Sequence, residues 1–260
     1  MPFEWIKRLV NRQTEPAEIE SYDPRRSGSL IVAVGGPGTG KSLLTFRIAL
    51  KAAYDAGLPF IAEDPNGDLA LYHDKAIERL RMLKRPSEDE LDKLYWLTDK
   101  SQVRIYSKEN VAGFAAIVEK YRKAASKSKR QRKPVLFAFI DEGGVMRRDS
   151  ESFWNMGAAF RNAGITAYTT IHKDTDVSRV GRQAIRAVIL FRGYEGTVEF
   201  FGKEIDAAQC TAPMSSDIVY MDNIDRELKH WNSDRDWENP PYCLVAPVQP
   251  TNVNPNIVRV

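Results

Sequence analysis

The chain has 260 residues, of which 43% are hydrophobic and 28% are charged, and its 38 Lys and Arg residues nearly balance 35 Asp and Glu residues. This composition predicts one large α/β domain in solution, and the net charge of only +3 excludes a uniformly basic nucleic-acid-binding surface. Two cysteines and three histidines are too few and too scattered for a disulfide framework or a zinc site. No apolar run reaches the length of a membrane span, and the first residues lack the apolar core of a signal peptide.

The two ends of the chain differ from its middle. Residues 1–28 form a polar lead-in whose apolar residues Phe3, Ile6 and Leu9 recur at helical spacing. Two interpretations are open: a short helix on the surface of its own domain, or a docking segment for a membrane or a partner. Residues 29–238 are expected to form the folded domain. Residues 239–260 carry five prolines and predict an extended arm.

A glycine-rich stretch follows the first apolar run. Residues 35–42 read Gly-Gly-Pro-Gly-Thr-Gly-Lys-Ser and fit G-x-x-x-x-G-K-[ST] at every position. The stretch lies between a predicted strand at 30–34 and a predicted helix at 43–50, which is the context that this motif requires. Glycines let successive backbone N–H groups point at a polyphosphate, while Lys41 reaches the β- and γ-phosphates and Ser42 ligates Mg²⁺. The residues expected to hold ATP are Gly36, Pro37, Gly38, Thr39, Gly40, Lys41, Ser42 and Leu43.

The next part of the chain alternates between strand and helix patterns. Gly57 is expected to end the first helix, and an acidic turn at 64–69 follows a short strand at 58–63. Ser87 and Glu90 have the spacing of a capping box at the start of a helix. The other predicted elements are helices at 73–84, 88–97 and 111–125 and a strand at 103–106.

A basic run follows the last of these helices. Its central cations are Lys127, Lys129, Arg130 and Arg132. One interpretation is a solvated surface loop, and the other is a contact with the phosphate backbone of a nucleic acid. The sequence leaves both open.

Two carboxylates follow an apolar strand at residues 135–140. Asp141 occupies the Walker B position, where a carboxylate can hold Mg²⁺ next to Ser42. Glu142 comes next, and a second carboxylate, not needed for the metal, can deprotonate an attacking water. The pair therefore predicts hydrolysis of the nucleotide rather than transfer to a small substrate.

The remaining core elements repeat the same alternation. We expect a helix at 152–163, a strand at 165–171 that ends at His172, a strand at 187–191 and an extra edge strand at 198–201. This alternation predicts a mainly parallel sheet with helices on both faces.

At this point the chain resembles the FtsK/HerA superfamily of DNA-pumping ATPases. The glycine-rich loop and the Asp141–Glu142 pair are common to many ATPases, and the turn at residues 64–68 is similar to one in HerA-type proteins. The most specific feature is Arg161, followed by Gly164-Ile165 and an apolar strand that leads to His172. In the family, this segment places an arginine finger and a polar sensor, usually Gln. His172 departs from that pattern, although an imidazole can also donate a hydrogen bond to a γ-phosphate.

The resemblance implies an α/β RecA-like (ASCE) P-loop NTPase fold, with the His172 strand between the P-loop strand and the Asp141 strand. It implies ATP and Mg²⁺ as cofactors, and a homo-oligomeric ring, a hexamer, that surrounds double-stranded DNA. Because the chain is a bare motor core, it looks most like the genome-packaging ATPases of tailless icosahedral viruses with an internal membrane. Such a protein acts in the host cytoplasm or the virion, where capsid vertex or viral membrane proteins are its partners.

Two other functions compete with DNA translocation. An ATPase that drives protein export or virion assembly, like the Zot-type factors of filamentous phages, would share the motifs but usually carries a transmembrane segment. A nucleotide-dependent binding module would not need Glu142 or Arg161. DNA stimulation of ATP turnover would separate the first alternative from a DNA translocase.

Overall fold

The structure is a computed structural model that describes residues 28–107, 116–121, 123, 135–142, 164–173, 176, 177, 182, 185–191, 197–206, 217–223, 226–238 and 241. The named elements, in chain order, are β1 (Leu30–Val34), α2 (Lys41–Asp55), β2 (Phe60–Asp64), α3 (Asp68–Arg81), α4 (Glu88–Thr98), β3 (Val103–Ser107), β4 (Leu136–Ile140), β5 (Ile165–Ile171), β6 (Ile185–Leu190), β7 (Thr197–Phe200), β8 (Lys203–Asp206), β9 (Asp217–Asp222) and β10 (Leu228–Asn232).

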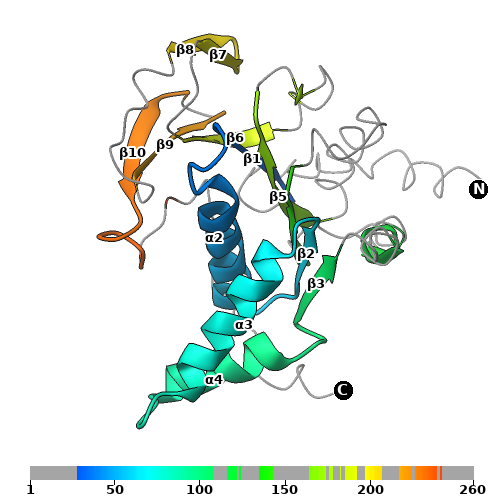
Figure 1. The fold of residues 1–260 in the computed structure, drawn as a ribbon. Coiled ribbons are helices and arrows are strands. Elements are labelled where there is room, and N and C mark those ends of the chain that lie inside the picture. The colour runs from blue at the N-terminus through cyan, green and yellow to red at the C-terminus, as the bar shows by residue number, and fades with distance from the viewer. Residues whose placement is uncertain are drawn as a thin grey trace, which may run out of the picture.

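An 8-stranded sheet organises the domain, with the strand order β10-β9-β6-β1-β5-β4-β2-β3 (Figure 1). The strands from β6 to β3 pair in parallel, and β9 and β10 extend the β6 edge in antiparallel fashion. The predicted mainly parallel sheet is therefore confirmed. The predicted strand order is also confirmed, because β5, which leads to His172, lies between β1 and β4.

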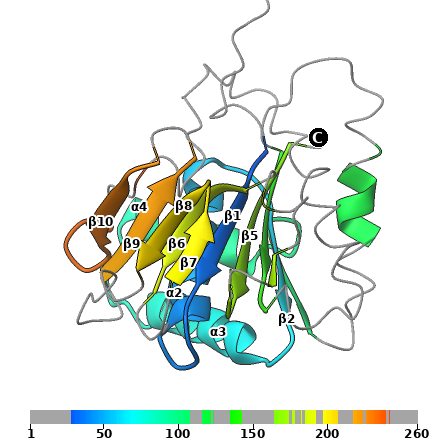
Figure 2. The ribbon, with the colours of Figure 1, turned by 90° about the horizontal axis from the view of Figure 1, so that it is seen from above.

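Helices α2, α3 and α4 cover one face of this sheet. Phe46 of α2 is fully buried and meets the rings of Phe60, Tyr72 and Phe139 edge-on, at centroid distances of 5.5, 6.1 and 5.7 Å. Such edge-to-face contacts add to the large area that aromatic side chains bury. Figure 2 shows α2 and α3 behind the sheet, on the same side of it.

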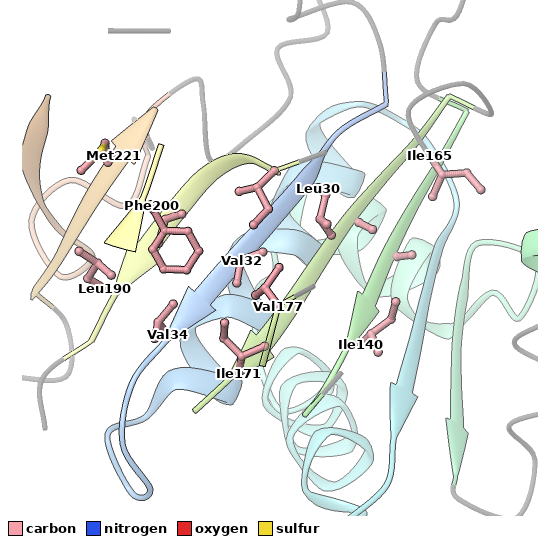
Figure 3. Packing of buried hydrophobic residues seen from close by; sticks show 14 of the residues in the cluster. Leu30, Val32, Val34, Ile140, Ile165, Ile171, Val177, Leu190, Phe200 and Met221 are labelled. Carbon is pink, nitrogen blue, oxygen red and sulfur yellow. The ribbon is translucent and has the colours of Figure 1, made fainter. Parts of the chain in front are cut away.

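The opposite face has its own core, in which Leu30, Val32 and Val34 of β1 belong to the same cluster as Phe200 of β7 (Figure 3). Val118, from the helical residues 116–121, belongs to the same cluster. Helices therefore cover both faces, as predicted. Strands β1, β4, β5 and β6 are buried along their whole length. As expected for central parallel strands, β1 and β4 are continuous apolar runs, whereas β5 and β6 also bury threonines and Arg186.

Two predicted elements differ from the structure. The helix expected at 73–84 is α3, which begins at Asp68 because the Asp64 carboxylate accepts hydrogen bonds from the N–H groups of Gly67 and Ala70, at 2.9 and 2.8 Å. The extra edge strand expected at 198–201 was wrong in its placement. It is β7, which pairs only with β8 in a separate 2-stranded sheet. Positive φ at Phe201 and Gly202 gives the two-residue turn that joins them.

Several predictions lie outside the described residues. They are the lead-in up to residue 27, the helix at 152–163, and the arm after residue 238 apart from residue 241. Of the helix predicted at 111–125, residues 116–121 and 123 are described and are helical. The strands β8, β9 and β10 were not predicted from the sequence.

Candidate active site

The glycine-rich loop connects β1 to α2 at the carboxyl end of a central strand. Gly38 and Gly40 have φ values of 72° and 78°, a left-handed backbone conformation that other residues rarely adopt. Thr39 Oγ1 donates a hydrogen bond to the Gly36 carbonyl at 2.9 Å and so closes the loop on itself. The loop therefore has the curled shape in which backbone N–H groups can surround a phosphate.

Close packing fixes the entry to the loop, and the start of α2 offers N–H groups to an anion. A Cβ added at Gly35 would lie 2.6 Å from Phe191 Cβ, so this position accepts only glycine without a shift of the chain after β6. Within the described residues, the first turn of α2 has no side-chain cap and no acidic residue. Its N–H groups and the positive end of the helix dipole are thus available to an anion.

Lys41 begins α2, and its side chain is only 5% exposed. Burial lowers the pKa of the Lys41 ammonium group, while the nearby carboxylates of Asp141 and Glu142 oppose that shift. A cation held in this way has lost hydration that a bound phosphate would replace. The structure places Lys41 where the sequence predicts the phosphate-binding cation.

Asp141 follows β4 and is hydrogen-bonded to Ser42 at the start of α2, although the two residues are 99 positions apart in the sequence. The Ser42 hydroxyl donates a hydrogen bond to Asp141 Oδ1 at 2.7 Å. A hydroxyl and a carboxylate in contact are the oxygen donors that Mg²⁺ accepts, with phosphate oxygens and water completing an octahedron. The predicted metal ligands therefore fit a magnesium ion. Within the described residues, no group of three or more His, Cys, Asp or Glu offers an all-protein metal site.

Glu142 has an uncommon backbone, with φ of 50°. Its N–H group donates a hydrogen bond to Thr170 Oγ1 at 2.8 Å, and its Oε1 lies 3.8 Å from His172 Nε2. The side chains of Glu142 and His172 are both about a third exposed, at 28% and 30%. A carboxylate held beside the metal-binding groups and still open to solvent is placed to act on a water molecule.

His172 continues directly from β5, and an acidic residue fixes its backbone. Its N–H group and that of Lys173 donate hydrogen bonds to Asp176 Oδ2, at 3.2 and 2.9 Å. The strand end thus turns sharply at His172 and holds the imidazole on the same edge as Glu142. The structure therefore brings together the predicted residues Lys41, Ser42, Asp141, Glu142 and His172, and the rest of the predicted ATP-binding residues, from Gly36 to Leu43, lie on the same loop and helix start.

Five predicted site residues lie outside the described residues: Arg161, Lys127, Lys129, Arg130 and Arg132. Sequence analysis also missed two that the structure brings to the site, Thr170 and Asp176. For Thr170 a signal existed, since side chains two positions apart on a strand share a face and Thr170 comes two residues before His172.

No protein-family model matches the sequence, and a comparison with curated proteins finds no relative. Solved structures do match. The genome packaging NTPase B204 of Sulfolobus turreted icosahedral virus 2, in complex with ATP-gammaS, is 17% identical, has a TM-score of 0.50, and aligns with 80% of this chain and 98% of its own. The DNA-packaging ATPase B204 of Sulfolobus Turreted Icosahedral Virus is 16% identical over the same shares of both chains, also at a TM-score of 0.50.

A bacterial ATPase gives a similar match. EssC (ATPases 2 and 3) of Geobacillus thermodenitrificans is 13% identical with a TM-score of 0.53, over 80% of this chain and 40% of its own. The chain shares the fold of these ATPases. The RecA-like α/β architecture expected from the sequence is thereby confirmed. Among the described residues, no helix combines the length and apolar character that crossing a membrane requires.

Proposed function

We propose that the chain is a Mg²⁺-dependent ATPase that translocates double-stranded DNA and packages a viral genome into a preformed capsid. The observation that carries the ATPase part is the hydrogen bond between Ser42 and Asp141 at 2.7 Å, with Glu142 next in the chain and Lys41 buried beside both. The packaging part is supported by fold similarity to B204, described as a genome packaging NTPase, over 98% of the B204 chain.

In this proposal, the loop N–H groups and Lys41 bind the β- and γ-phosphates of ATP. Ser42 and Asp141 hold Mg²⁺, which when bound neutralises negative charge on those phosphates. Glu142 accepts the proton of the water that attacks the γ-phosphorus, and ADP leaves in line with that water. His172, on the same edge as Glu142, donates a hydrogen bond to the γ-phosphate.

The test measures phosphate release by the full chain with Mg²⁺ and with EDTA, in the presence and absence of duplex DNA. We expect turnover that requires Mg²⁺ and rises with DNA. Glu142→Gln is the matched control, because it keeps the size and hydrogen-bonding shape of the side chain but removes the base. Failure of the parent chain to hydrolyse ATP would contradict the ATPase assignment.

The basic run provides the proposed DNA contact. Neutralising Lys127, Lys129, Arg130 and Arg132 together should weaken DNA binding and flatten its salt dependence, since each lost phosphate contact removes roughly 0.9 from the slope of log affinity against log salt. An unchanged slope would return this run to the interpretation of a solvated loop. ATP turnover without DNA serves as the internal control.

The alternative, an ATPase for protein export or virion assembly, shares the catalytic groups and is separated by its cargo. A chain that hydrolyses ATP but neither binds duplex DNA nor responds to it would favour this alternative. EssC, with a TM-score of 0.53, shows that the same fold is shared outside B204.

We further propose a homo-oligomeric ring, a hexamer, in which Arg161 of one subunit completes the site of its neighbour. A guanidinium supplied in trans would stabilise the charge that develops on the transferred phosphoryl group. Mixing Arg161→Ala chains with Glu142→Gln chains should then restore some turnover, because an interface with both intact groups can form. If mixed rings demonstrably assemble but turnover is not restored, action of Arg161 in trans is contradicted.

The packaging proposal also names where the chain acts and what it meets. It places the protein in the host cytoplasm or the virion, at a capsid vertex or next to viral membrane proteins. Co-sedimentation of the purified chain with empty capsids, compared with capsids stripped of vertex proteins, tests this association. Equal recovery with both kinds of capsid would argue against a vertex partner.

A further inference from the structure

Thr170 connects the two carboxylate residues that the proposed mechanism uses. It is fully buried near the carboxyl end of β5, opposite Ala33 of β1. Its hydroxyl donates a hydrogen bond to Asp141 Oδ1 at 2.5 Å and accepts one from the Glu142 N–H group at 2.8 Å. One side-chain oxygen thus bonds the side chain of the first acidic residue and the backbone of the second.

The bond to Asp141 sets the orientation of its carboxylate. Both hydrogen bonds to this carboxylate, from Ser42 at 2.7 Å and from Thr170, fall on Oδ1. Within the described residues no hydrogen bond reaches Oδ2, so none of these residues competes there with water or a metal ion. If the Ser42 hydroxyl turns toward Mg²⁺, the bond from Thr170 still holds the carboxylate in place.

The bond to Glu142 supports an uncommon backbone. A φ of 50° is in the left-handed region, which side chains other than Asn and Asp seldom occupy without support from their surroundings. The Thr170 hydroxyl provides such support, because it accepts the N–H group of that same residue. The direction in which the Glu142 side chain points thus depends on Thr170.

We propose that Thr170 is a positioning residue, which aims the Asp141 carboxylate at Mg²⁺ and the Glu142 carboxylate at the attacking water. The inference rests on the proposed ATPase function and assigns a role that neither the sequence motifs nor the fold similarity provides. Thr170 itself does not touch the nucleotide in this assignment. Loss of its hydroxyl should therefore change catalysis and metal dependence more than nucleotide binding as such.

The same strand provides a matched control. Thr166 is also fully buried on β5. It lies on the same face of the sheet as Thr170, because the two are four positions apart and side chains alternate between the faces. Within the described residues, the Thr166 hydroxyl has no hydrogen-bond partner. Thr166→Val therefore removes a buried hydroxyl from the same strand without removing a hydrogen bond between described residues.

The experiment compares Thr170→Val, Thr170→Ser, Thr170→Ala and Thr166→Val in the full chain. It measures kcat and KM for ATP, the Mg²⁺ concentration that gives half-maximal ATP-gammaS binding, ATP-gammaS affinity in EDTA, and the urea midpoint of unfolding. We expect Thr170→Val to lower kcat about 10- to 100-fold, as small misplacements of catalytic groups do, and to raise the Mg²⁺ requirement several-fold, with affinity in EDTA unchanged. Thr166→Val should match the parent in kcat, KM, Mg²⁺ requirement and affinity in EDTA, and its urea midpoint should not fall, because the hydroxyl that it removes is buried without a partner.

Serine and alanine both lack the methyl group of threonine and differ only in the hydroxyl. Comparing Thr170→Ser with Thr170→Ala therefore tests whether the hydroxyl is needed, even if valine distorts the strand. Serine should keep most of the parental kcat and Mg²⁺ dependence, and alanine should not. Equal behaviour of the two, or an alanine variant whose EDTA affinity falls as much as its kcat, would overturn the assignment. A parent chain without Mg²⁺-dependent ATP-gammaS binding and turnover would instead overturn the proposed function on which it rests.

Discussion

At the carboxyl edge of β1, β4 and β5, two charged side chains are buried, whereas the hairpin formed by α3 and α4 exposes several of its apolar ones. Lys41 and Asp141 are 5% and 6% exposed at the edge. On the hairpin, Leu71, Met82 and Tyr95 are 54%, 74% and 69% exposed. Figure 1 shows α3 and α4 next to each other, and their inner sides pack against β2, β3 and α2.

The two regions also differ in where their hydrogen bonds come from. The edge joins residues that are far apart in sequence, as Ser42 and Asp141 are, so its geometry exists only in the folded domain. The hairpin relies on local hydrogen bonds, such as the capping box between Ser87 and Glu90. Its links to α2 include the hydrogen bond from Tyr54 Oη to Asp89 Oδ1 at 3.1 Å and the ring contact of Tyr54 with Trp96. Changes at the edge should therefore alter chemistry, and changes on the hairpin should alter local stability alone.

Lys41→Met should give the largest effect and should act in opposite directions on function and stability. Turnover and Mg²⁺–ATP binding should be lost, because the main phosphate-binding cation is gone. Burial lowers the pKa of Lys41 below 10.5, so its charged form is disfavoured in the folded state. The nucleotide-free variant should then be more stable than the parent at pH 7, as measured by urea unfolding.

The pH dependence provides the check on this explanation. Between the lowered pKa of the folded state and 10.5, the unfolded state binds more protons, so parental stability rises with pH in that window. The advantage of Lys41→Met should shrink as the pH approaches 10.5 from below. An advantage that is constant with pH would mean that packing of the methionine, not the buried charge, is responsible.

Glu142→Gln should have the next largest effect, confined to chemistry. Turnover should fall about 10²- to 10⁴-fold because the general base is lost, while ATP still binds. Stopped-flow phosphate release and equilibrium binding of ATP-gammaS separate the two quantities. A variant that hydrolyses ATP at the parental rate would show that another group is the base.

The sequence predicted the edge well where local patterns determine it. The P-loop motif, the apolar strand before Asp141 and the strand before His172 place their residues through main-chain geometry, and the structure brings these residues together. The strand pattern could point to Thr170 as a neighbour of His172, but it could not predict the role of Thr170, because that role depends on the register between β5 and the residues that follow β4.

The β9–β10 pair shows a second limit of prediction from the sequence. Only Trp231 of β10 is buried, and the other residues of that strand are partly or fully exposed, so the strand has little apolar periodicity. Its pairing with β9 and the docking of its tryptophan near Trp237 determine its structure. Such tertiary contacts override local propensity and cannot be predicted from one short segment.

Ser87→Ala tests the hairpin and should have a modest effect on stability. Ser87 Oγ accepts the third N–H group of α4, and loss of such a cap costs about 1 kcal/mol. Hydrogen exchange of α4 amides should therefore quicken, while kcat for ATP and its Mg²⁺ dependence stay parental. Ser87→Asp, which restores a capping oxygen, is the control. Loss of turnover in the alanine variant would mean that the hairpin is coupled to the catalytic edge.

The smallest expected effect concerns His73, whose half-buried imidazole lies on α3. Burial lowers the pKa of His73 below 6.5, while Asp74, 3.9 Å from Nδ1, opposes the shift. Above pH 6.5 the side chain is neutral in the folded and unfolded states and adds no pH dependence. As the pH falls below 6.5, the unfolded state takes up the proton first, so the hairpin loses stability.

Hydrogen exchange of α3 and α4 amides, corrected for intrinsic rates, should therefore show more frequent opening at pH 5.5 than at pH 7.5. The matched control is His73→Gln, which is neutral at both pH values and should flatten the difference. Because the groups that act on the imidazole, Asp74 and the Leu97 backbone, both lie on the hairpin, protection of β1 and β4 should not follow the same change. An equal loss of protection in the parent and in His73→Gln would assign the acid sensitivity to other groups, and a parallel loss in β1 and β4 would show that the hairpin and the sheet unfold as one unit.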